Sequence, residues 1–383
     1  MPDPTSSDPV TRSPGRSARA PEAGIALCLS GGGYRAMLFH VGSLWRLNEL
    51  GYLKALKRVS SVSGGSITAG RLALSWTRLD FDASGVARQF EAEIVRPIRG
   101  LASRTIDRGA ILRGTLLPGE VSDRVAAAYR DHLFGDATLQ DLPDAPRFVI
   151  NATNVQSGAL WRFSRHAMRD YRVGSIPRPM LSLAVAVTAS SAFPPVLSPV
   201  RLALDPLLYA PPTGGEDLHR APFTTDVFLT DGGVYDNLSL ETAWKRFDTI
   251  LVSDGGGKMA PEPEPHTDWV RHSLRINALI DNQVRSLRKR QVIDAFENGV
   301  RKGTYWGIRT DIADYRLADA LPCPLAATTA LANYPTRLKE VDQRTQEQLI
   351  NWGYAVCDSA IRRHVDTAHP APGRFPYAGT GVG

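Results

Sequence analysis

Two strand–turn–helix units follow one another near the N-terminus, and they constrain the fold more than any other feature of the sequence. In the first unit, residues 24–30 form a short apolar run that is typical of a buried strand. Gly31-Gly32-Gly33 interrupts this run, and residues 34–50 then carry apolar side chains at helical spacing. Gly51 follows, where a glycine commonly ends a helix.

The second unit begins at once, and together the two units predict the class of fold. Residues 56–62 are strand-like, Ser63-Gly64-Gly65 makes a tight turn, and residues 66–78 have a helical pattern. Strands joined through helices pair in parallel, with the helices on the faces of the sheet. We therefore expect an α/β protein of three layers, with helices flanking a mostly parallel central sheet. Further strands are expected at residues 147–155, 226–230 and 249–253.

The composition is that of a folded chain with a sizeable core. The 383 residues are 43% hydrophobic and 22% charged, which allows one large domain or two smaller ones. Three scattered cysteines suit neither a disulfide framework nor a zinc site, so we expect reduced thiols and no metal. No run approaches the roughly 18 apolar residues of a transmembrane helix. Residues 1–23 have no apolar segment of the kind that a signal peptide contains.

The net charge of +6 suits an anionic membrane surface or a nucleic acid. Basic and acidic residues are mixed along the chain, however, and we expect no nucleic-acid partner. One stretch is more strongly basic, with Arg285, Arg288, Lys289, Arg290, Arg301 and Lys302. We interpret it as the solvated face of a helix, which permits contact with lipid without demonstrating it.

Four segments are expected along the chain. They are a disordered tail at 1–23, a core at 24–257, a helical extension packed on the core at 258–372, and a flexible tail at 373–383. In the extension we expect a helix near 268–289, a short strand near 304–309, and a last helix at 336–362 with Thr336 as its N-cap.

The first glycine turn, Gly31-Gly32-Gly33, directs several backbone N–H groups to one point beside the positive end of a helix. Such a turn suits an anion, and three interpretations compete. A dinucleotide fingerprint would need an acidic residue at the end of the next strand, and that strand ends in Ser61-Val62-Ser63. A turn that merely closes the connection is the second interpretation. An oxyanion hole is the third, and the motifs that follow favour it.

The second turn, Ser61-Val62-Ser63-Gly64-Gly65, has the form of a nucleophile elbow. A small residue stands two positions before Ser63 and a glycine two positions after it, as a tight strand-to-helix turn requires. The hydroxyl of Ser63 would then project at a helix N-terminus, where developing negative charge is stabilised. The usual residue at the first position is glycine, and this chain has Ser61 there.

A serine needs a base, and carboxylates are better placed in this sequence than the eight histidines. Asp231-Gly232-Gly233 follows a strand, so Asp231 would lie at the carboxyl edge of the sheet, where α/β sites form. Asp254-Gly255-Gly256 repeats the pattern one strand later and is a rival base. No histidine follows a strand in a comparable turn, so a Ser–His–Asp triad has weaker support.

In their order and spacing, these motifs resemble those of the patatin-like phospholipase family. The resemblance rests on Gly31-Gly32-Gly33-Tyr34-Arg35-Ala36, Ser61-Val62-Ser63-Gly64-Gly65 and Asp231-Gly232-Gly233. A fourth block, Ala189-Ser190-Ser191-Ala192-Phe193-Pro194, is similar to a small-residue block of that family which ends in proline. The similarity covers residues 24–257, and the later residues resemble the extension of some bacterial members.

The resemblance implies a patatin-like fold and a lipid acyl-hydrolase that uses a Ser63–Asp231 dyad without cofactor or metal. The oxyanion hole would lie at Gly31, Gly32 and Gly33, with the N–H groups of Gly32 and Gly33 as donors. Arg35 resembles a basic residue placed near a phosphate headgroup. The expected partner is a lipid ester at a membrane or micelle surface, and the expected location is cytoplasmic and peripheral to the membrane.

Three other functions stay open from the sequence. A small-ester esterase or thioesterase would use the same scaffold, and only chain-length preference separates it from a lipase. A non-catalytic lipid-binding relative is disfavoured by the intact Ser63, Asp231 and triple glycine. A nucleotide-dependent enzyme is disfavoured by the missing strand-end acid. The oligomeric state is not predicted.

Overall fold

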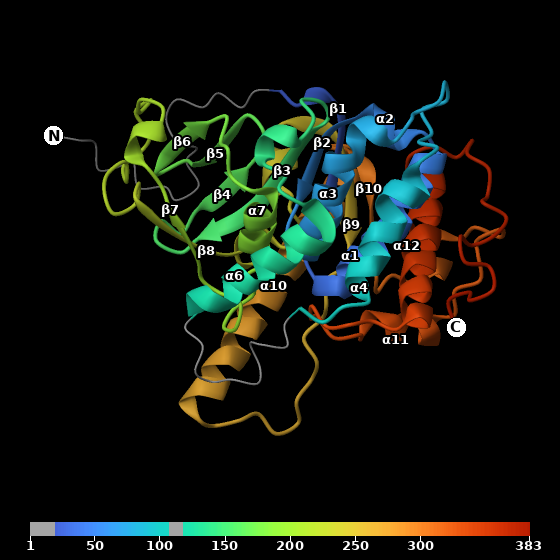
Figure 1. The fold of residues 1–383 in the computed structure, drawn as a ribbon. Coiled ribbons are helices and arrows are strands. Elements are labelled where there is room, and N and C mark those ends of the chain that lie inside the picture. The colour runs from blue at the N-terminus through green and yellow to red at the C-terminus, as the bar shows by residue number, and fades with distance from the viewer. Residues whose placement is uncertain (1–19, 107–117) are drawn as a thin grey trace.

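A ten-stranded sheet runs through the computed structural model, which describes residues 20–106 and 118–383. The strand order is β10-β9-β1-β2-β3-β4-β5-β6, and β8 pairs with both β3 and β7 (Figure 1). The expected class, a three-layer α/β fold, is confirmed. The predicted tail at 1–23 lies, except for its last four residues, outside the described part of the chain.

One half of the sheet is parallel, and it contains the two predicted strand–turn–helix units. Its strands are β1 (Glu22–Leu29), β2 (Leu56–Ser61), β3 (Arg147–Asn154), β9 (Phe247–Asp254) and β10 (Lys302–Gly307). All neighbours in this half pair in parallel, so their carboxyl ends meet at one edge of the sheet. That edge gathers the two glycine-containing turns and Asp254.

The other half of the sheet is antiparallel, whereas the sequence predicted a mostly parallel sheet. It comprises β4 (Leu160–Phe163), β5 (Ala167–Asp170), β6 (Gly174–Pro177), β7 (Val200–Ala203) and β8 (Asp226–Asp231). β8 runs antiparallel to β3, with Asp231 opposite Ala152. Four of these strands have only four residues each, too few for a clear alternation of apolar and polar side chains.

Both faces of the central strands are buried, which explains why the sequence of β1 is a nearly continuous apolar run. Leu27 and Leu29 pack into the main hydrophobic core, whereas Ala26 and Cys28 pack into a smaller cluster on the opposite face. The main core includes side chains of α1 (Gly33–Glu49) and α3 (Gly64–Ser75). The smaller cluster includes side chains of α9 (Glu241–Trp244) and Val292 of α10 (Trp269–Glu297). Helices therefore cover both faces of the sheet.

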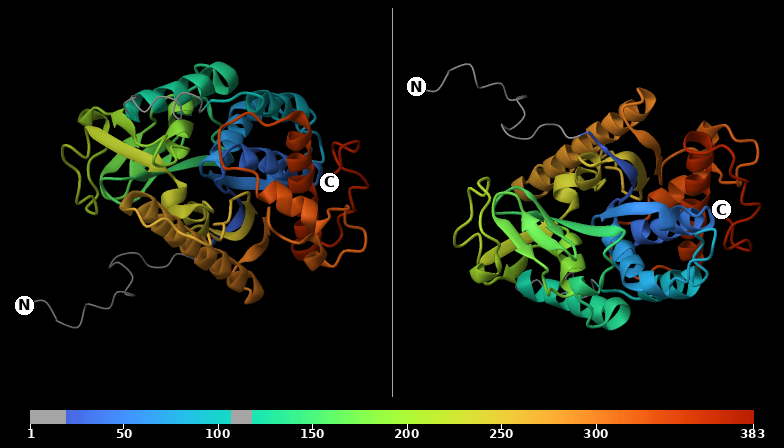
Figure 2. Two further views of the ribbon diagram at one scale, coloured as in Figure 1. Left: turned by 90° about the horizontal axis from the view of Figure 1, so that it is seen from below. Right: turned by 90° about the horizontal axis from the view of Figure 1, so that it is seen from above.

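The last helix, α12 (Gln343–His364), packs along α1 (Figures 1 and 2). Glycines allow this close packing, because a Cβ on Gly42 would lie 1.8 Å from the Ile350 carbonyl oxygen. On α12, a Cβ on Gly353 would lie 1.9 Å from the carbonyl oxygen of Phe39. As a result α1 is buried along nearly its whole length, and α12 forms an additional helical layer.

The remaining helices include α4 (Arg96–Ala102), α6 (Pro118–Tyr129), α7 (Leu183–Ser190), α8 (Gly233–Asp236) and α11 (Leu325–Ala332). Among the described residues, no helix is both long enough and apolar enough to cross a bilayer. The three cysteines are free and buried, as expected for reduced thiols.

The start of the last helix was predicted wrongly. Its N-cap is Asp342, whose side chain accepts a hydrogen bond from the Thr345 N–H at 2.9 Å, and not Thr336. The residues after Thr336 form bends and not a helix, and they pack on the first glycine turn, where the Arg337 carbonyl accepts the Tyr34 N–H. The last residues, predicted as a flexible tail, lie against α12, with the Asn351 amide donating to the carbonyls of Tyr377 and Gly381.

Candidate active site

Ser63 occupies the tight turn between β2 and α3 with a backbone that non-glycine residues rarely adopt. Its φ of 51° and ψ of −124° are strained for a residue with a Cβ. Such strain is typical of a nucleophile elbow, which lifts the hydroxyl out of the sheet. The residue is 7% exposed, so neighbouring residues enclose most of its surface.

The neighbouring serines are engaged in hydrogen bonds within the core. Ser60 bonds to the hydroxyls of Ser239 and Thr242 at 2.8 and 2.7 Å. Ser61, the departure from the usual elbow glycine, is fully buried and accepts a hydrogen bond from the Ser66 hydroxyl at 3.0 Å. The turn therefore accommodates Ser61 by giving its hydroxyl a partner on the first turn of α3.

The predicted base, Asp231, ends β8 and is buried. Its Oδ1 accepts the Gly233 N–H at 2.7 Å, whereas Oδ2 has no hydrogen-bond partner among the described residues. Burial raises the pKa of this carboxyl to about 6; the Gly233 N–H and the Ser63 hydroxyl oppose this rise, and Asp281 adds to it. Ser63 is thus close enough to affect Asp231, although the two side chains do not form a hydrogen bond of full geometry. Such bonds are often long in unliganded enzymes.

The small-residue block at the end of α7 joins the elbow to the aspartate turn. The carbonyl oxygen of Ser190 accepts the N–H of Ser63 and the N–H of Gly232, each at 3.1 Å. The next residues hold β8, because the Ala192 carbonyl accepts the Asp231 N–H at 3.0 Å. One carbonyl oxygen therefore bridges the turns of the two predicted catalytic residues, which lie 168 positions apart in the sequence.

The first glycine turn lies directly beside the elbow. A Cβ on Gly64 would lie 2.2 Å from the Gly33 carbonyl oxygen, so the two turns meet backbone to backbone. Gly32 and Gly33 have φ values of 143° and 59°, and their N–H groups have no hydrogen-bond acceptor among the described residues. The Gly31 N–H, in contrast, donates to the Asn237 carbonyl at 3.2 Å. The donors at Gly32 and Gly33 are therefore available to a ligand, and the one at Gly31 is occupied.

Asn237 is a site residue that the sequence analysis missed. A Cβ added to Gly31 would lie 2.6 Å from Asn237 Oδ1 and 3.0 Å from the Cβ of Ser63. A Cβ added to Gly233 would also lie 2.6 Å from the same Oδ1. The amide thus lies between the glycine turn and the aspartate turn. The available signal was its position six residues after Asp231, on the turn that the Asp-Gly-Gly motif opens.

Arg35 lies on the first turn of α1 and is buried. Its Nε donates to the Gly255 carbonyl at 3.2 Å and its Nη1 to the Tyr334 carbonyl at 2.5 Å, while Nη2 has no partner among the described residues. Burial lowers the pKa of Arg35 to about 10, Arg309 and Arg285 lower it further, and Asp254 opposes them. Asp254 therefore opposes the effect of burial and of the two arginines without balancing it, and Arg35 forms no ion pair among the described residues. The expected contact with a phosphate stays a prediction.

Asp254, the rival base, is held as a counterion. Its Oδ1 accepts the Gly256 N–H and its Oδ2 the Tyr305 hydroxyl, both at 2.8 Å. Burial acts to raise the pKa of this carboxyl, but Arg285, Tyr305 and the Gly256 N–H outweigh it and lower the pKa. A carboxylate with both oxygens bonded and a nearby cation is poorly suited to accept a proton from a serine.

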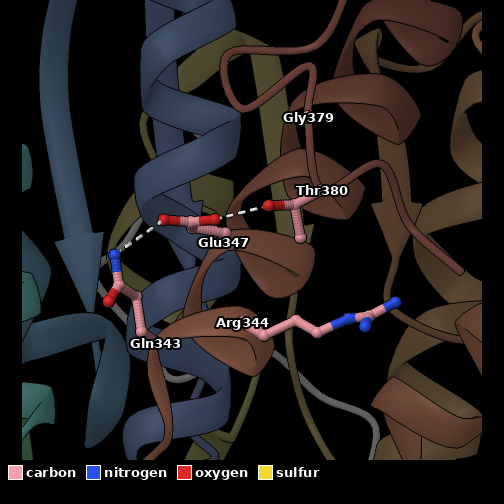
Figure 3. Close-up of a pocket in the computed structure, with 5 residues that line it drawn as sticks. All are labelled: Gln343, Arg344, Glu347, Gly379 and Thr380. Atoms are coloured by element: carbon pink, nitrogen blue, oxygen red, sulfur yellow. Dashed lines mark hydrogen bonds between the residues drawn. The ribbon is translucent and has the colours of Figure 1, made fainter.

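Two open pockets lie elsewhere, and none of the predicted site residues lines them. The first lies between the start of α12 and the C-terminal segment, where the Glu347 carboxylate accepts hydrogen bonds from Gln343 and Thr380 (Figure 3). Arg99 also pairs with Glu347 at 2.9 Å. The second pocket is lined by residues that include Arg104, His132 and Glu340. Neither resembles the arrangement around Ser63.

The fold and the site together agree with the predicted class, an α/β fold with a nucleophile elbow. Ser63 has strained backbone geometry and lies on a strand–turn–helix turn at the carboxyl edge of the parallel strands, which is the form of such an elbow. The particular family follows from the sequence, because the model for "Patatin-like phospholipase" matches residues 27–244, more than half of the chain. The chain belongs to the patatin-like phospholipase family. No curated protein sequence matches it.

Solved structures similar to this chain are distant. Human GIVD cytosolic phospholipase A2 is 13% identical with a TM-score of 0.49, and the match covers 88% of this chain and 61% of the human chain. VipD from Legionella pneumophila is 16% identical with a TM-score of 0.33, covering 88% and 66%. The type III effector protein ExoU of Pseudomonas aeruginosa is 15% identical with a TM-score of 0.33, covering 90% and 54%. This chain thus spans less than two thirds of each of these proteins.

Proposed function

We propose that the protein is a serine acyl-hydrolase that cleaves fatty-acyl esters of phospholipids or related lipids, with Ser63 as nucleophile and Asp231 as its base. The observation that supports this most is the Ser190 carbonyl, which accepts N–H groups from both Ser63 and Gly232 and so brings the two turns together. Family membership supports the lipid substrate, and the buried Asp231 with a pKa of about 6 supports the role of base.

In the first step, the Ser63 Oγ would attack the acyl carbonyl carbon while its proton passes to the Asp231 carboxylate. The carbonyl oxygen becomes an oxyanion, which the free N–H groups of Gly32 and Gly33 would stabilise. One such donor typically contributes about 3–4 kcal/mol. Collapse then breaks the ester C–O bond, and the proton on Asp231 passes to the leaving alcohol oxygen.

In the second step, water would attack the acyl-enzyme and give its proton to Asp231. The bond between Ser63 Oγ and the acyl carbon breaks, the fatty acid leaves, and the proton on Asp231 returns to the Ser63 oxygen. Both half-reactions therefore need the carboxylate ionised before the nucleophile attacks. Asn237, whose amide lies between the two turns, would help to position them.

A fluorophosphonate probe tests the nucleophile directly, because such probes react covalently with an activated serine. We expect labelling of Ser63 in the wild-type protein, as mapped by peptide mass spectrometry, and its loss in Ser63→Ala. Ser66→Ala is the matched control, because Ser66 lies three residues away on the same turn and bonds to Ser61 and Ser190. Labelling that persists in Ser63→Ala, or that maps to Ser66, would refute the assignment.

A substrate panel then tests the lipid class. Short soluble esters, monoacylglycerols and phospholipids are compared with the same enzyme preparation. We expect higher kcat/KM on long-chain lipid esters than on short esters. A preference for the short esters would leave the dyad in place but make the protein a small-ester esterase. Hydrolysis of all substrates must disappear in Ser63→Ala.

A further inference from the structure

A histidine that the proposed reaction does not use lies next to the residue that precedes the first glycine turn. His40 is fully buried on α1, and among the described residues no other histidine is buried. Its Nε2 lies 2.9 Å from the carbonyl oxygen of Ser30, and its Nδ1 lies 2.8 Å from the hydroxyl oxygen of Ser253. Ser30 directly follows β1 and Ser253 lies in β9, so the imidazole spans the ends of two neighbouring strands.

These two partners determine the state of the imidazole. A carbonyl oxygen can only accept a hydrogen bond, so the proton of the neutral ring must be on Nε2, and Nδ1 must accept the Ser253 hydroxyl proton. Burial lowers the pKa of His40 to about 4, although the bond to Ser30 and the charge of Asp254 oppose this change. The ring is therefore neutral at neutral pH. Both of its nitrogens are occupied, so neither can take the proton of Ser63.

Ser30 connects three turns of the candidate site. Its carbonyl oxygen also accepts the N–H of Gly65 on the elbow, at 3.1 Å. Its hydroxyl oxygen accepts the N–H of Gly255, which follows Asp254, at 2.8 Å. The hydroxyl itself donates to the Gly31 carbonyl at 3.2 Å. A shift of Ser30 would therefore move the glycine turn against the elbow.

The peptide group between Ser30 and Gly31 is held at both ends. Because a peptide group is planar, its carbonyl oxygen and its N–H turn together. His40 and Gly65 donate to the carbonyl oxygen, and the Gly31 N–H donates to the Asn237 carbonyl at 3.2 Å. This is the last peptide group before the two N–H groups that are available to a ligand. Its orientation therefore determines how the chain enters the part of the turn that carries the donors.

Such an anchor is needed because glycine has more backbone freedom than any other residue. Gly32 and Gly33 have φ values of 143° and 59°, and they have no side chains to hold their peptide groups in place. On the far side of the turn, the Tyr34 N–H donates to the Arg337 carbonyl at 3.0 Å. His40 supplies the corresponding bond on the near side. Donors that stabilise an oxyanion must be pre-organised, so both anchors matter for the rate.

We infer that His40 is a positioning residue: its Nε2–H holds the Ser30 carbonyl so that the N–H groups of Gly32 and Gly33 point at the acyl oxyanion. The inference rests on the proposed function, because it gives the imidazole no chemistry apart from that site. In this role His40 neither exchanges a proton nor contacts the substrate. It acts on the transition state through the backbone of the glycine turn.

The kinetics of His40→Leu test the inference, since leucine fills a similar space and makes neither bond. Titration with the fluorophosphonate probe first counts the reactive sites, so that rates refer to folded enzyme. On a soluble ester, kcat should fall about 10- to 100-fold, because misplaced oxyanion donors act mainly on the transition state. KM should change little. The affinity for a trifluoromethyl ketone, whose adduct with serine carries an oxyanion, should fall by a similar factor.

Two amide variants provide a matched pair. In His40→Gln the side-chain NH2 can reach the position of Nε2 and donate to Ser30, so kcat and inhibitor affinity should recover most of the loss. In His40→Asn the shorter side chain brings its amide only to the position of Nδ1, so both quantities should stay low. A purely structural role would not separate these two variants when rates are compared per reactive site.

Asn48→Leu controls for the loss of buried hydrogen bonds elsewhere on α1. Asn48 is buried, donates to the Ala87 carbonyl at 3.1 Å and accepts the Ala87 N–H at 2.7 Å. This variant should lower the free energy of unfolding and leave kcat and inhibitor affinity at their wild-type values. A loss of kcat as large as that in His40→Leu would overturn the inference, because the rate would then follow stability in general.

Nitrogen-15 NMR of histidine-labelled protein tests the bond itself in the wild type. At neutral pH the His40 ring should be neutral with its proton on Nε2, and a charged ring or a proton on Nδ1 would overturn the inference. So would wild-type kcat in His40→Leu with the probe still on Ser63. A probe that labels another serine in the wild type would instead refute the proposed function, and the inference with it.

Discussion

Asp231 and Asp254 have the same local structure and opposite electrostatic properties. Each ends a strand, precedes two glycines, and accepts the N–H of the residue two positions later, at 2.7 and 2.8 Å. Yet the pKa of the Asp231 carboxyl is raised to about 6, and that of Asp254 is lowered. The difference comes from the second oxygen and its surroundings.

The second oxygen of Asp254 accepts the Tyr305 hydroxyl, and Arg285 compensates for the buried charge. The second oxygen of Asp231 has no hydrogen-bond partner among the described residues, and the nearby charge is another carboxylate, Asp281. Burial therefore dominates at Asp231, whereas cations dominate at Asp254. An Asp-Gly-Gly turn thus determines where the carboxylate lies, whereas the neighbouring residues determine its pKa.

The largest expected difference between Asp231 and Asp254 is in the activity of their asparagine variants. Asp231→Asn removes the only base proposed for Ser63, and we expect kcat/KM on a soluble ester to fall about 10³-fold or more. Asp254→Asn should cost a few-fold at most, because that carboxylate is a counterion. Circular dichroism must show both variants folded. A large loss in Asp254→Asn with retained activity in Asp231→Asn would exchange the two roles.

The dependence of kcat/KM on pH also distinguishes Asp231 from Asp254. The base must be ionised, so kcat/KM should rise through a midpoint near the pKa of about 6 and level off above it. Each pH unit below the midpoint should cost about tenfold. Asp254, whose pKa is lowered, stays ionised throughout and gives no step in this range. A profile that is flat from acidic to neutral pH would contradict the assignment of Asp231.

Stability should respond in opposite directions at the two sites. The folded-state pKa of Asp231, about 6, exceeds its ordinary 3.8, so its stabilising effect is complete below the ordinary value and is lost as pH rises through 6. Above that range the ionised carboxylate costs on the order of 3 kcal/mol. At pH 8, Asp231→Asn should therefore raise the free energy of unfolding, and the gain should shrink toward pH 5.

Asp254 provides the matched variant for this measurement. Its pKa is lowered in the folded state, so it stabilises the protein above its ordinary pKa and loses that effect as pH falls. Asp254→Asn should accordingly lower the free energy of unfolding at pH 8. Urea denaturation of the two variants and the wild type compares the signs directly. If both variants changed the free energy of unfolding in the same direction, the two carboxylates would not have the opposite pKa shifts that their contacts indicate.

The smallest expected effect concerns the influence of α10 on the base. Asp281 contributes to the raised pKa of Asp231, so Asp281→Asn should move the midpoint of the pH profile to lower pH while leaving the plateau rate unchanged. Asp294→Asn, on the same helix and exposed, is the control and should leave the midpoint in place. An unmoved midpoint in Asp281→Asn would mean that the helix does not act on the site.

Local patterns predicted the parallel half of the fold well, since each element there has a strong local signal. The buried strands β1 and β2 and the two glycine turns are each made of consecutive residues. The predicted nucleophile Ser63 lies in one of these turns. The antiparallel half has no such signal, because its strands β4 to β7 have four residues each, too few for a clear alternation of apolar and polar side chains. The cap of α12 was misplaced for a similar reason, since residue 337 is held by contact with the first glycine turn and not by local propensity.

The sequence by itself determined which residues end or follow the strands β1, β2, β8 and β9, because apolar runs, glycine turns and helical periodicity are local properties. It thereby identified Ser63, the triple glycine and two candidate carboxylates. The family resemblance already pointed to Asp231 as the base. Only the tertiary structure gave the surroundings that separate the pKa of Asp231 from that of Asp254, and only it revealed Asn237. The physical reason is that a pKa and a buried or exposed face depend on what surrounds a residue, and those surroundings come from residues far apart in the chain.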